Sequence, residues 1–282
     1  TMRKLIPMFL FSALLWSCSD DDDALIGNGP GESKECAITA LNNDIEGTLT
    51  FTDMKDGSTT IDIELDGTEE GTTYLTYLRH ESAAEQGETA LSLEPVDGAT
   101  GLSTTIASSL DDETSINYED LIDFDGHLII LIEGEGEEEI PVAYADLGEN
   151  QLTGESFSID LDAVGEAAVS GIAIFEERES GETLVRISLE GTEEGNTHPA
   201  QIRIASAESE TDELGVSLNP VNGETGTSLT HVANLDQEIQ DGQAITYEEL
   251  IALDGHINIY LSQEENETVG AQGTISEGTS QE

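Results

Sequence analysis

Apolar and polar residues alternate along several short segments of this chain, as they do in β-strands with one buried face. In the segment TTIDIELDG, Ile61, Ile63 and Leu65 alternate with acidic residues, so one face is apolar and the other is acidic. The preceding segment GTLTF is joined to it through MKDGS, where Asp56 and Gly57 form a dipeptide that favours a hairpin turn. The pattern therefore predicts an antiparallel pair of strands.

Further strands are predicted along both halves of the chain. The segments are ALSLE, LSTTIA and LIILI in the first half, and GVSLN, SLTHVA and INIYL in the second half. The segment TLVRISLE repeats the alternation through Val185, Ile187 and Leu189, whereas Leu184 does not fit it. Polar turns separate these segments, which gives about seven strands in each half and favours an all-β fold of the sandwich type.

One short helix is predicted in each half. Thr246 and Glu249 have the spacing of a capping box, and Tyr247, Leu250 and Ile251 then give the helix one apolar side. Asn117 and Asp120 take the same capping positions in the first half.

The chain also contains a tandem repeat. The segment Ile63–Gly71 matches Ile187–Gly195 at an offset of 124 residues, and two later pairs of segments match at slightly larger offsets. The offset grows because a few residues are inserted between the matching segments, as expected for loops on a shared scaffold. A repeat of this length is a complete domain, because solenoid repeats are far shorter. We therefore predict two domains, 36–150 and 151–282, with a boundary near Gly148–Glu155.

The N-terminus has the basic-then-apolar order of a secretory signal. Arg3 and Lys4 precede the apolar stretch Leu5–Trp16, which is shorter than the roughly 20 residues that a bilayer requires. The segment LLWSC resembles the lipobox of bacterial lipoproteins, which implies a signal peptide over residues 1–17 and lipidation of Cys18. A secreted protein with a chance cysteine is the alternative.

The residues after Cys18 resemble the acidic export signal that sends Bacteroidota lipoproteins to the outer face of the outer membrane. The signal would consist of Ser19, Asp20, Asp21, Asp22 and Asp23. An acidic tether that faces the periplasm is the alternative. Gly and polar residues follow, so residues 18–35 are predicted to form a lipidated flexible tether. Cys36 is predicted to be either a buried apolar residue or an exposed thiol.

The formal net charge is −53, from 61 acidic and 8 basic residues. Such a field repels phosphate, so we predict no binding to nucleic acid or to anionic lipid headgroups. The acidic surface either keeps the protein dissolved in salty water or includes carboxylates that bind calcium at low affinity.

Several sequence blocks together resemble the CHRD domain, named for chordin, in the tandem form found in Bacteroidota lipoproteins. The blocks are HPA, PVxGxTGxS, TYEELI followed by DG, and ADLGENQLTGE, and the resemblance covers both repeats. It implies a Greek-key β-sandwich in each repeat, either immunoglobulin-like or superoxide-dismutase-like.

The histidines of the family motif HPAHIH are mostly replaced in this chain. His198 keeps the first position, but the next two fall on Gln201 and Arg203, and in the first repeat on Tyr77 and Arg79. A charged arginine cannot ligate a metal, and it repels a cation. We therefore predict no metal site and no cofactor, with a superoxide-dismutase-like metalloenzyme as the alternative.

The sequence contains no GxSxG or HExxH motif, and no cysteine–histidine pair with an orienting partner. We predict a non-catalytic outer-membrane lipoprotein, held to the membrane by its N-terminal lipid and exposed on the cell surface. It would engage a protein or glycan, alone or as an accessory subunit of an outer-membrane complex. Arg79, Arg203, His198 and Tyr77 are the candidate ligand-contacting residues, and an internal salt bridge is the alternative role for the two equivalent arginines.

Overall fold

The computed structural model describes residues 31–41, 44–133, 139–204, 213–236, 242–262 and 268–275. The predicted signal peptide, the lipidation site Cys18 and the export signal Ser19–Asp23 lie outside these described residues. Within the described ranges, no helix has the length and apolar character needed to cross a membrane.

The first repeat folds into one nine-stranded sheet. Its strands are β1 (Ser33–Ala40), β2 (Glu46–Asp53), β3 (Thr59–Asp66), β4 (Thr73–His80), β5 (Thr89–Ser92), β6 (Val96–Asp97), β7 (Leu102–Ala107), β8 (Gly126–Glu133) and β9 (Glu139–Asp146). The order is β5-β4-β6-β7-β3-β2-β1-β9-β8, and a further pairing of β4 with β8 closes the sheet into a barrel-like shape.

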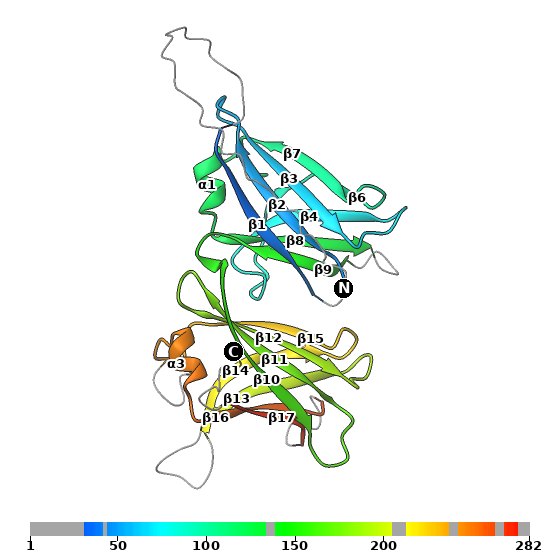
Figure 1. Cartoon of the computed structure of the whole chain (residues 1–282), viewed down its shortest axis with the longest axis vertical. Coiled ribbons are helices and arrows are strands. Elements are labelled where there is room, and N and C mark those ends of the chain that lie inside the picture. The colour runs from blue at the N-terminus through cyan, green and yellow to red at the C-terminus, as the bar shows by residue number, and fades with distance from the viewer. Residues whose placement is uncertain are drawn as a thin grey trace, which may run out of the picture.

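The second repeat follows the short helix η1 (Gly148–Asn150) and forms an eight-stranded sheet. Its strands are β10 (Leu152–Ala163), β11 (Ser170–Arg178), β12 (Thr183–Glu190), β13 (Thr197–Ile204), β14 (Glu213–Asn222), β15 (Thr227–Val232), β16 (Gly255–Tyr260) and β17 (Val269–Ile275). The order is β14-β13-β16-β17-β10-β11-β12-β15. The two end strands, β14 and β15, contact each other, so this barrel is nearly closed. Figure 1 shows the two barrels stacked along the long axis of the molecule.

The all-β prediction and the predicted helices are confirmed. The helices are α1 (Tyr118–Ile122) and α3 (Tyr247–Ile251), and each begins with the expected capping box. In α1, Asn117 accepts a hydrogen bond from the Asp120 backbone; in α3, Thr246 does the same for Glu249. In return, the carboxylate of Asp120 or Glu249 accepts a hydrogen bond from the backbone N–H of the capping residue, Asn117 or Thr246.

The sheet of each repeat is continuous, whereas the sequence suggested two separate sheets facing each other. The sheet is continuous because some strands pair with one neighbour along their first residues and with a different neighbour along their last residues. In β1, residues from Ser33 to Ile38 pair with β2, and Thr39 and Ala40 then pair with β9. In β4, Thr73 and Tyr74 pair with β6, while residues further along pair with β8.

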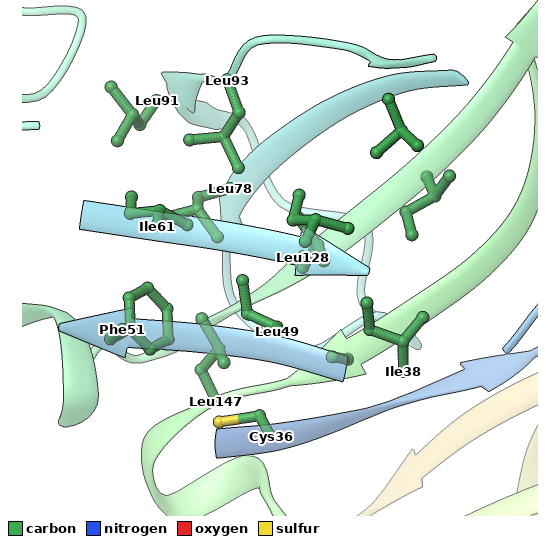
Figure 2. Close-up of a cluster of buried hydrophobic side chains, with 14 of the residues drawn as sticks. Cys36, Ile38, Leu49, Phe51, Ile61, Leu78, Leu91, Leu93, Leu128 and Leu147 are labelled. Atoms are coloured by element: carbon green, nitrogen blue, oxygen red, sulfur yellow. The ribbon is translucent and has the colours of Figure 1, made fainter. Parts of the chain in front are cut away.

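Each barrel encloses its own apolar core. In the first repeat, Leu49, Phe51 and Ile61 are almost completely buried, as the alternation in β2 and β3 predicts. Cys36 lies in the same cluster (Figure 2) and its thiol accepts a hydrogen bond from Gln151. Burial raises the pKa of the Cys36 thiol, so the side chain behaves as a small apolar residue rather than as a reactive thiol.

Candidate binding cleft between the repeats

The outer face of β4, β8 and β9, which we call the repeat-1 face, is apolar at its centre. Tyr77 lies opposite Ile129, and Ile129 lies opposite Tyr144. Ile129, Leu131 and Tyr144 are at most 7% exposed, although they belong to a hydrophobic cluster separate from the core of their own barrel. The second repeat supplies the cover for this face.

Leu184 on β12 is the residue of the second repeat at the centre of this contact. It is fully buried and shares a cluster with Ile129 and Tyr144, and Leu229 from β15 packs against the same cluster. In the first repeat the equivalent position holds Thr60, on a surface that no repeat covers. The residue that breaks the strand alternation in sequence is therefore an interface residue.

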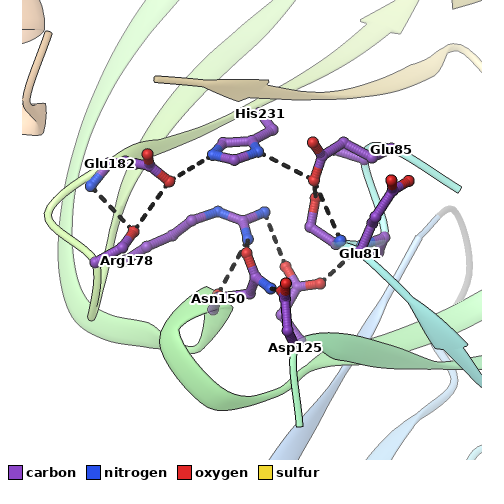
Figure 3. Close-up of polar contacts among 12 residues, drawn as sticks. Glu81, Glu85, Asp125, Asn150, Arg178, Glu182 and His231 are labelled. Carbon is purple, nitrogen blue, oxygen red and sulfur yellow. Dashed lines mark hydrogen bonds and ion pairs between the residues drawn. The ribbon is translucent and has the colours of Figure 1, made fainter. Parts of the chain in front are cut away.

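A buried ion pair also joins the repeats. Arg178, at the end of β11, has a side chain with no exposed surface, and its Nη2 lies 3.0 Å from Oδ2 of Asp146 at the end of β9. Arg178 Nη1 donates to the Asn150 side-chain oxygen at 2.8 Å, and Asn150 Nδ2 donates to Asp125 at 2.9 Å (Figure 3). The backbone N–H of Ala83 donates to Oδ1 of Asp146 at 2.8 Å. These contacts connect both barrels through the η1 segment.

Each charge of this buried ion pair is stabilised by the other one. Burial raises the pKa of Asp146, and the adjacent Arg178 guanidinium opposes that rise. The two groups meet as an ion pair without a well-aligned hydrogen bond between them. A buried charge that loses its partner is strongly destabilising, so removal of either group alone should weaken the contact between the repeats.

His231 on β15 forms a second polar bridge between the repeats. Its Nδ1 lies 3.1 Å from Glu85 of the first repeat, and its Nε2 lies 2.7 Å from Glu182 of the second. Figure 3 shows the ring between these two side chains. Because an ionised carboxylate only accepts hydrogen bonds, both contacts are satisfied when both ring nitrogens carry protons. Close by, the Asn219 side chain donates to the Ala84 backbone oxygen at 3.2 Å.

Acidification should weaken this bridge. Burial alone would raise the pKa of Glu85, but hydrogen bonds from Ser82 and from His231 hold it below the ordinary value. A carboxylate with a lowered folded-state pKa contributes stability above its unfolded value, about 4.3, and loses that contribution as pH falls through the folded-state pKa. We expect the Tm of Glu85→Gln to fall less steeply than that of the wild type below about pH 4.3. Thermal unfolding across this range measures it, with Glu88→Gln as the control; identical profiles for wild type and Glu85→Gln would contradict the prediction.

A cleft of about 780 Å³ opens beside the joined surfaces. The first repeat contributes Arg79, His127, Ile129, Leu131 and Tyr144 to its wall, together with the Ala83–Gln86 loop. The second repeat contributes Asn219, Pro220, Ser228 and Leu229, with Thr197 at the start of β13. The floor is thus the repeat-1 face, and β14 and β15 of the second repeat form the opposite wall.

Several polar groups in the wall of the cleft have unused hydrogen-bonding capacity. The Tyr144 hydroxyl, the Ser228 hydroxyl and Arg79 Nε are buried without a hydrogen-bond partner among the described residues. Burial raises the pKa of Tyr144 far above its ordinary value, so its hydroxyl is a neutral donor. Burial lowers the pKa of His127, whose Nδ1 lies 2.8 Å from the Glu81 carbonyl oxygen. The neutral ring donates from Nδ1 and has an acceptor at Nε2.

The structure brings together two of the four candidate ligand-contacting residues. Arg79 lies over the ring of Tyr77, with Cζ 5.9 Å from the ring centroid, and Arg79 lines the cleft. His198 is almost completely buried, and its Nδ1 lies 3.1 Å from the Tyr260 carbonyl oxygen. Arg203 lies on β13, outside the set of described residues that line the cleft.

Two further observations concern the charged and potential metal-binding side chains of the described residues. The salt bridges among the described residues involve Arg178, Arg186 and His231, and Arg79 is in none of them. Within the same ranges, no group of three or more histidine, cysteine, aspartate or glutamate side chains is placed to hold a metal ion.

Sequence reasoning missed the residues that join the repeats. Nothing in the sequence pattern around Arg178 or His231 marks either residue as part of a contact between domains. Two signals pointed to the interface. Leu184 interrupts an alternating strand, and the run LIILI of β8 is apolar at every position, which indicates a strand that is buried on both faces.

Comparison with known proteins yields no matching family model, curated protein or solved structure. The chain is therefore characterised by its own fold and site. It is an all-β protein of two barrel-like repeats, with a polar-walled cleft between them.

Proposed function

We propose that this chain is a non-catalytic, lipid-anchored protein of the outer-membrane surface that binds part of a protein or glycan in the cleft between its repeats. The observation that carries the proposal is the composition of the cleft wall. Both repeats contribute to it, and the Tyr144 and Ser228 hydroxyls lie in it without partners among the described residues. A binding site is typically a mostly apolar concavity with a few convergent polar groups.

The cleft supplies the means of recognition. Arg79 offers a positive charge, Tyr144 offers a neutral donor and His127 offers a ring acceptor. Ile129 and Leu131 add apolar surface to the same wall of the cleft. Buried apolar and polar contacts join the barrels beside the cleft, and walls held in place in this way would need little ordering when a ligand enters.

We also propose that each barrel is a curled form of the Greek-key sandwich of the CHRD type. Supporting this, β2, β3 and β7 lie on one side of the first core, and β4, β8 and β9 lie on the other. Strands β1 and β4 pass from one side to the other, which would turn two facing sheets into a continuous one.

The acidic tether and its lipid would hold this unit away from the membrane surface. The membrane would then be a partner only through the anchor, because the net charge of −53 repels anionic headgroups. In such a position the cleft is accessible to a surface polymer or to a neighbouring subunit of an outer-membrane complex.

Loss of the Arg79 charge should weaken ligand binding at least about tenfold, which is the worth of one charged hydrogen bond. The full chain is immobilised and exposed to detergent-solubilised outer membranes and to their released polysaccharide, and bound material is quantified by mass spectrometry. Arg79→Gln is compared with the wild type and with Lys55→Gln, which removes an exposed positive charge from the β2–β3 turn.

Two results would count against the proposal. One is equal capture by the wild type and by Arg79→Gln. The other is about one copper or zinc ion per repeat in elemental analysis, lost on His198→Ala, which would favour the metalloenzyme instead. Capture of a set of transporter subunits that the released polysaccharide does not displace would identify the chain as an accessory subunit.

A further inference from the structure

The two ends of the cleft differ in charge. At one end, Arg79 on β4 lies directly opposite His127 on β8, and both residues line the cleft. Glu139 on β9 lines the cleft further along the same wall. It lies opposite Glu133, which is six residues beyond His127 on β8, or roughly 20 Å along the strand. The wall from the first repeat therefore runs from a positive end to a negative end.

The wall from the second repeat also places an acidic residue away from Arg79. His231, near the end of β15, lies 3.1 Å from Glu85, which belongs to the loop that follows β4. Glu224 lines the cleft from the turn that precedes β15, so the length of this strand separates it from His231. Like Glu139, Glu224 is exposed, and it is free to meet a positive group on a ligand.

The Arg79 end of the cleft is closed by the loop between β4 and β5. The loop leaves β4 at His80, whose backbone N–H donates to the Glu88 carbonyl oxygen at 2.9 Å. Its middle reaches the second repeat, through Glu85 against His231 (Figure 3) and through the Ala84 carbonyl oxygen, which accepts from Asn219 at 3.2 Å. An extended occupant that reaches Arg79 therefore has to end there, because the loop blocks its continuation.

Arg79 is available to pair with an anion. Among the described residues no hydrogen bond or ion pair engages it, and its Nε is buried without a partner. Its Cζ lies 5.9 Å from the centroid of the Tyr77 ring, and such a contact holds a guanidinium in place. A planar guanidinium held in this way can bind both oxygens of one carboxylate.

The carboxylates at this end of the cleft already have partners. Asp146 lies opposite His127, and it is paired with Arg178 at 3.0 Å. Glu85 lies within hydrogen-bonding distance of His231. Charges further away than about 8 Å are largely screened at physiological ionic strength, and Glu139 lies well beyond that distance. The positive charge of Arg79 is therefore not cancelled locally, although the chain as a whole is acidic.

We propose that the cleft binds the C-terminal end of a polypeptide in extended form, with its terminal carboxylate on Arg79 and a basic side chain, about six residues upstream, at Glu139 or Glu224. The inference rests on the proposed function, since it names the occupant of the same cleft. The hydroxyls of Tyr144 and Ser228, which have no partner among the described residues, would bond to the peptide groups in between.

The opposite charges of the two ends favour a polypeptide over a glycan. An anionic polysaccharide repeats its charge along its length, so it would bring negative groups against Glu139 and Glu224. A neutral polysaccharide offers no counter-ion to Arg79. A polypeptide always has a carboxylate at one end, and it can carry a lysine or arginine at the distance that the cleft requires.

The experiment measures how much of each of three pools of N-acetylated heptapeptides the immobilised full chain retains, at physiological ionic strength. The first pool begins with lysine, has random residues at all other positions and ends in a free carboxylate. The second differs only in a C-terminal amide, and the third only in an initial glutamate. We expect the first pool to be retained at least about tenfold more than the second, as measured by mass spectrometry. The net charge of −53 favours the more positive amide pool, so this preference requires a local cation.

The variants assign each preference to one end of the cleft. Arg79→Gln should remove the preference for the carboxylate and keep the preference for lysine over glutamate, whereas Lys55→Gln should change neither. The double variant Glu139→Gln/Glu224→Gln should reduce the preference for lysine and keep the preference for the carboxylate. Its matched control is Glu64→Gln/Glu190→Gln, which removes the same charge from exposed positions that do not line the cleft.

The possible outcomes separate this inference from the proposed function. Equal retention of the carboxylate and amide pools, or an unchanged carboxylate preference in Arg79→Gln, would overturn the inference. If the wild type retains no peptide but retains released outer-membrane polysaccharide, and Arg79→Gln loses it, the occupant is a glycan, and only the proposed function stands. If the wild type retains neither peptide nor polysaccharide nor any outer-membrane protein, both fail.

Discussion

Asp146→Ala should destabilise the protein by about 3–5 kcal/mol, the cost typical of breaking a buried ion pair from one side. The substitution leaves the Arg178 guanidinium fully buried and without its counter-ion, and it also removes the acceptor of the Ala83 backbone N–H. Urea unfolding monitored by circular dichroism measures the loss. Asp160→Ala, at an exposed position on β10, is the matched control and should change stability by less than about 0.5 kcal/mol.

Removing both partners tests the cause of this loss. In the double variant Asp146→Leu/Arg178→Met no buried charge is left without a partner, so most of the lost stability should return. A double variant as unstable as Asp146→Ala would show that the shape of the site, rather than the charge of Arg178, is responsible. A loss below about 1 kcal/mol in Asp146→Ala would mean that the guanidinium finds water or another partner.

The sequence predicted the local structure of this protein because that structure depends on neighbours along the chain. The alternation of Ile61, Ile63 and Leu65 identifies the buried face of β3, and the capping residues Asn117 and Thr246 mark the starts of α1 and α3. Gly57, with a φ of 92°, lies in the hairpin turn that its dipeptide predicts. Each of these features is determined by residues that lie within a few positions of it in the sequence.

The continuous sheet was beyond the reach of the same reasoning. Alternation shows which side chains face the core, but not which strand edges meet. Whether β4 pairs with β6, β8 or both depends on how far the chain twists around the core, and both pairings occur in the structure. Two facing sheets and a closed barrel therefore share one pattern of buried residues.

The cleft was predictable only in part for a related reason. Arg79 stood out because basic residues are rare in the chain, and it does line the cleft. His198 and Arg203 were grouped with it through the motif they occupy, but they belong to the other barrel and lie elsewhere. The interface that creates the cleft depends on how the two domains dock. Docking is visible in the sequence only where a strand has an apolar residue on its outer face as well as on its core face, as at Leu184.

Leu184→Thr should cost about 2–4 kcal/mol and should separate the unfolding of the two repeats, because a fully buried leucine on the contact surface is replaced by the residue that the first repeat has at this position. The core of the second barrel does not contain Leu184, so each barrel should keep its own fold. Differential scanning calorimetry should show one transition for the wild type and two for the variant.

The matched control is the reverse exchange at the equivalent site. Thr60→Leu places the same apolar side chain on the uncovered face of the first repeat and should leave the number of transitions unchanged. If Leu184→Thr unfolds in one transition at an unchanged Tm, then the apolar contact is not what couples the repeats, and the Arg178–Asp146 pair must do so alone. If the wild type already shows two transitions, then the walls of the cleft move independently, and a ligand held by both repeats would have to bear the cost of ordering them.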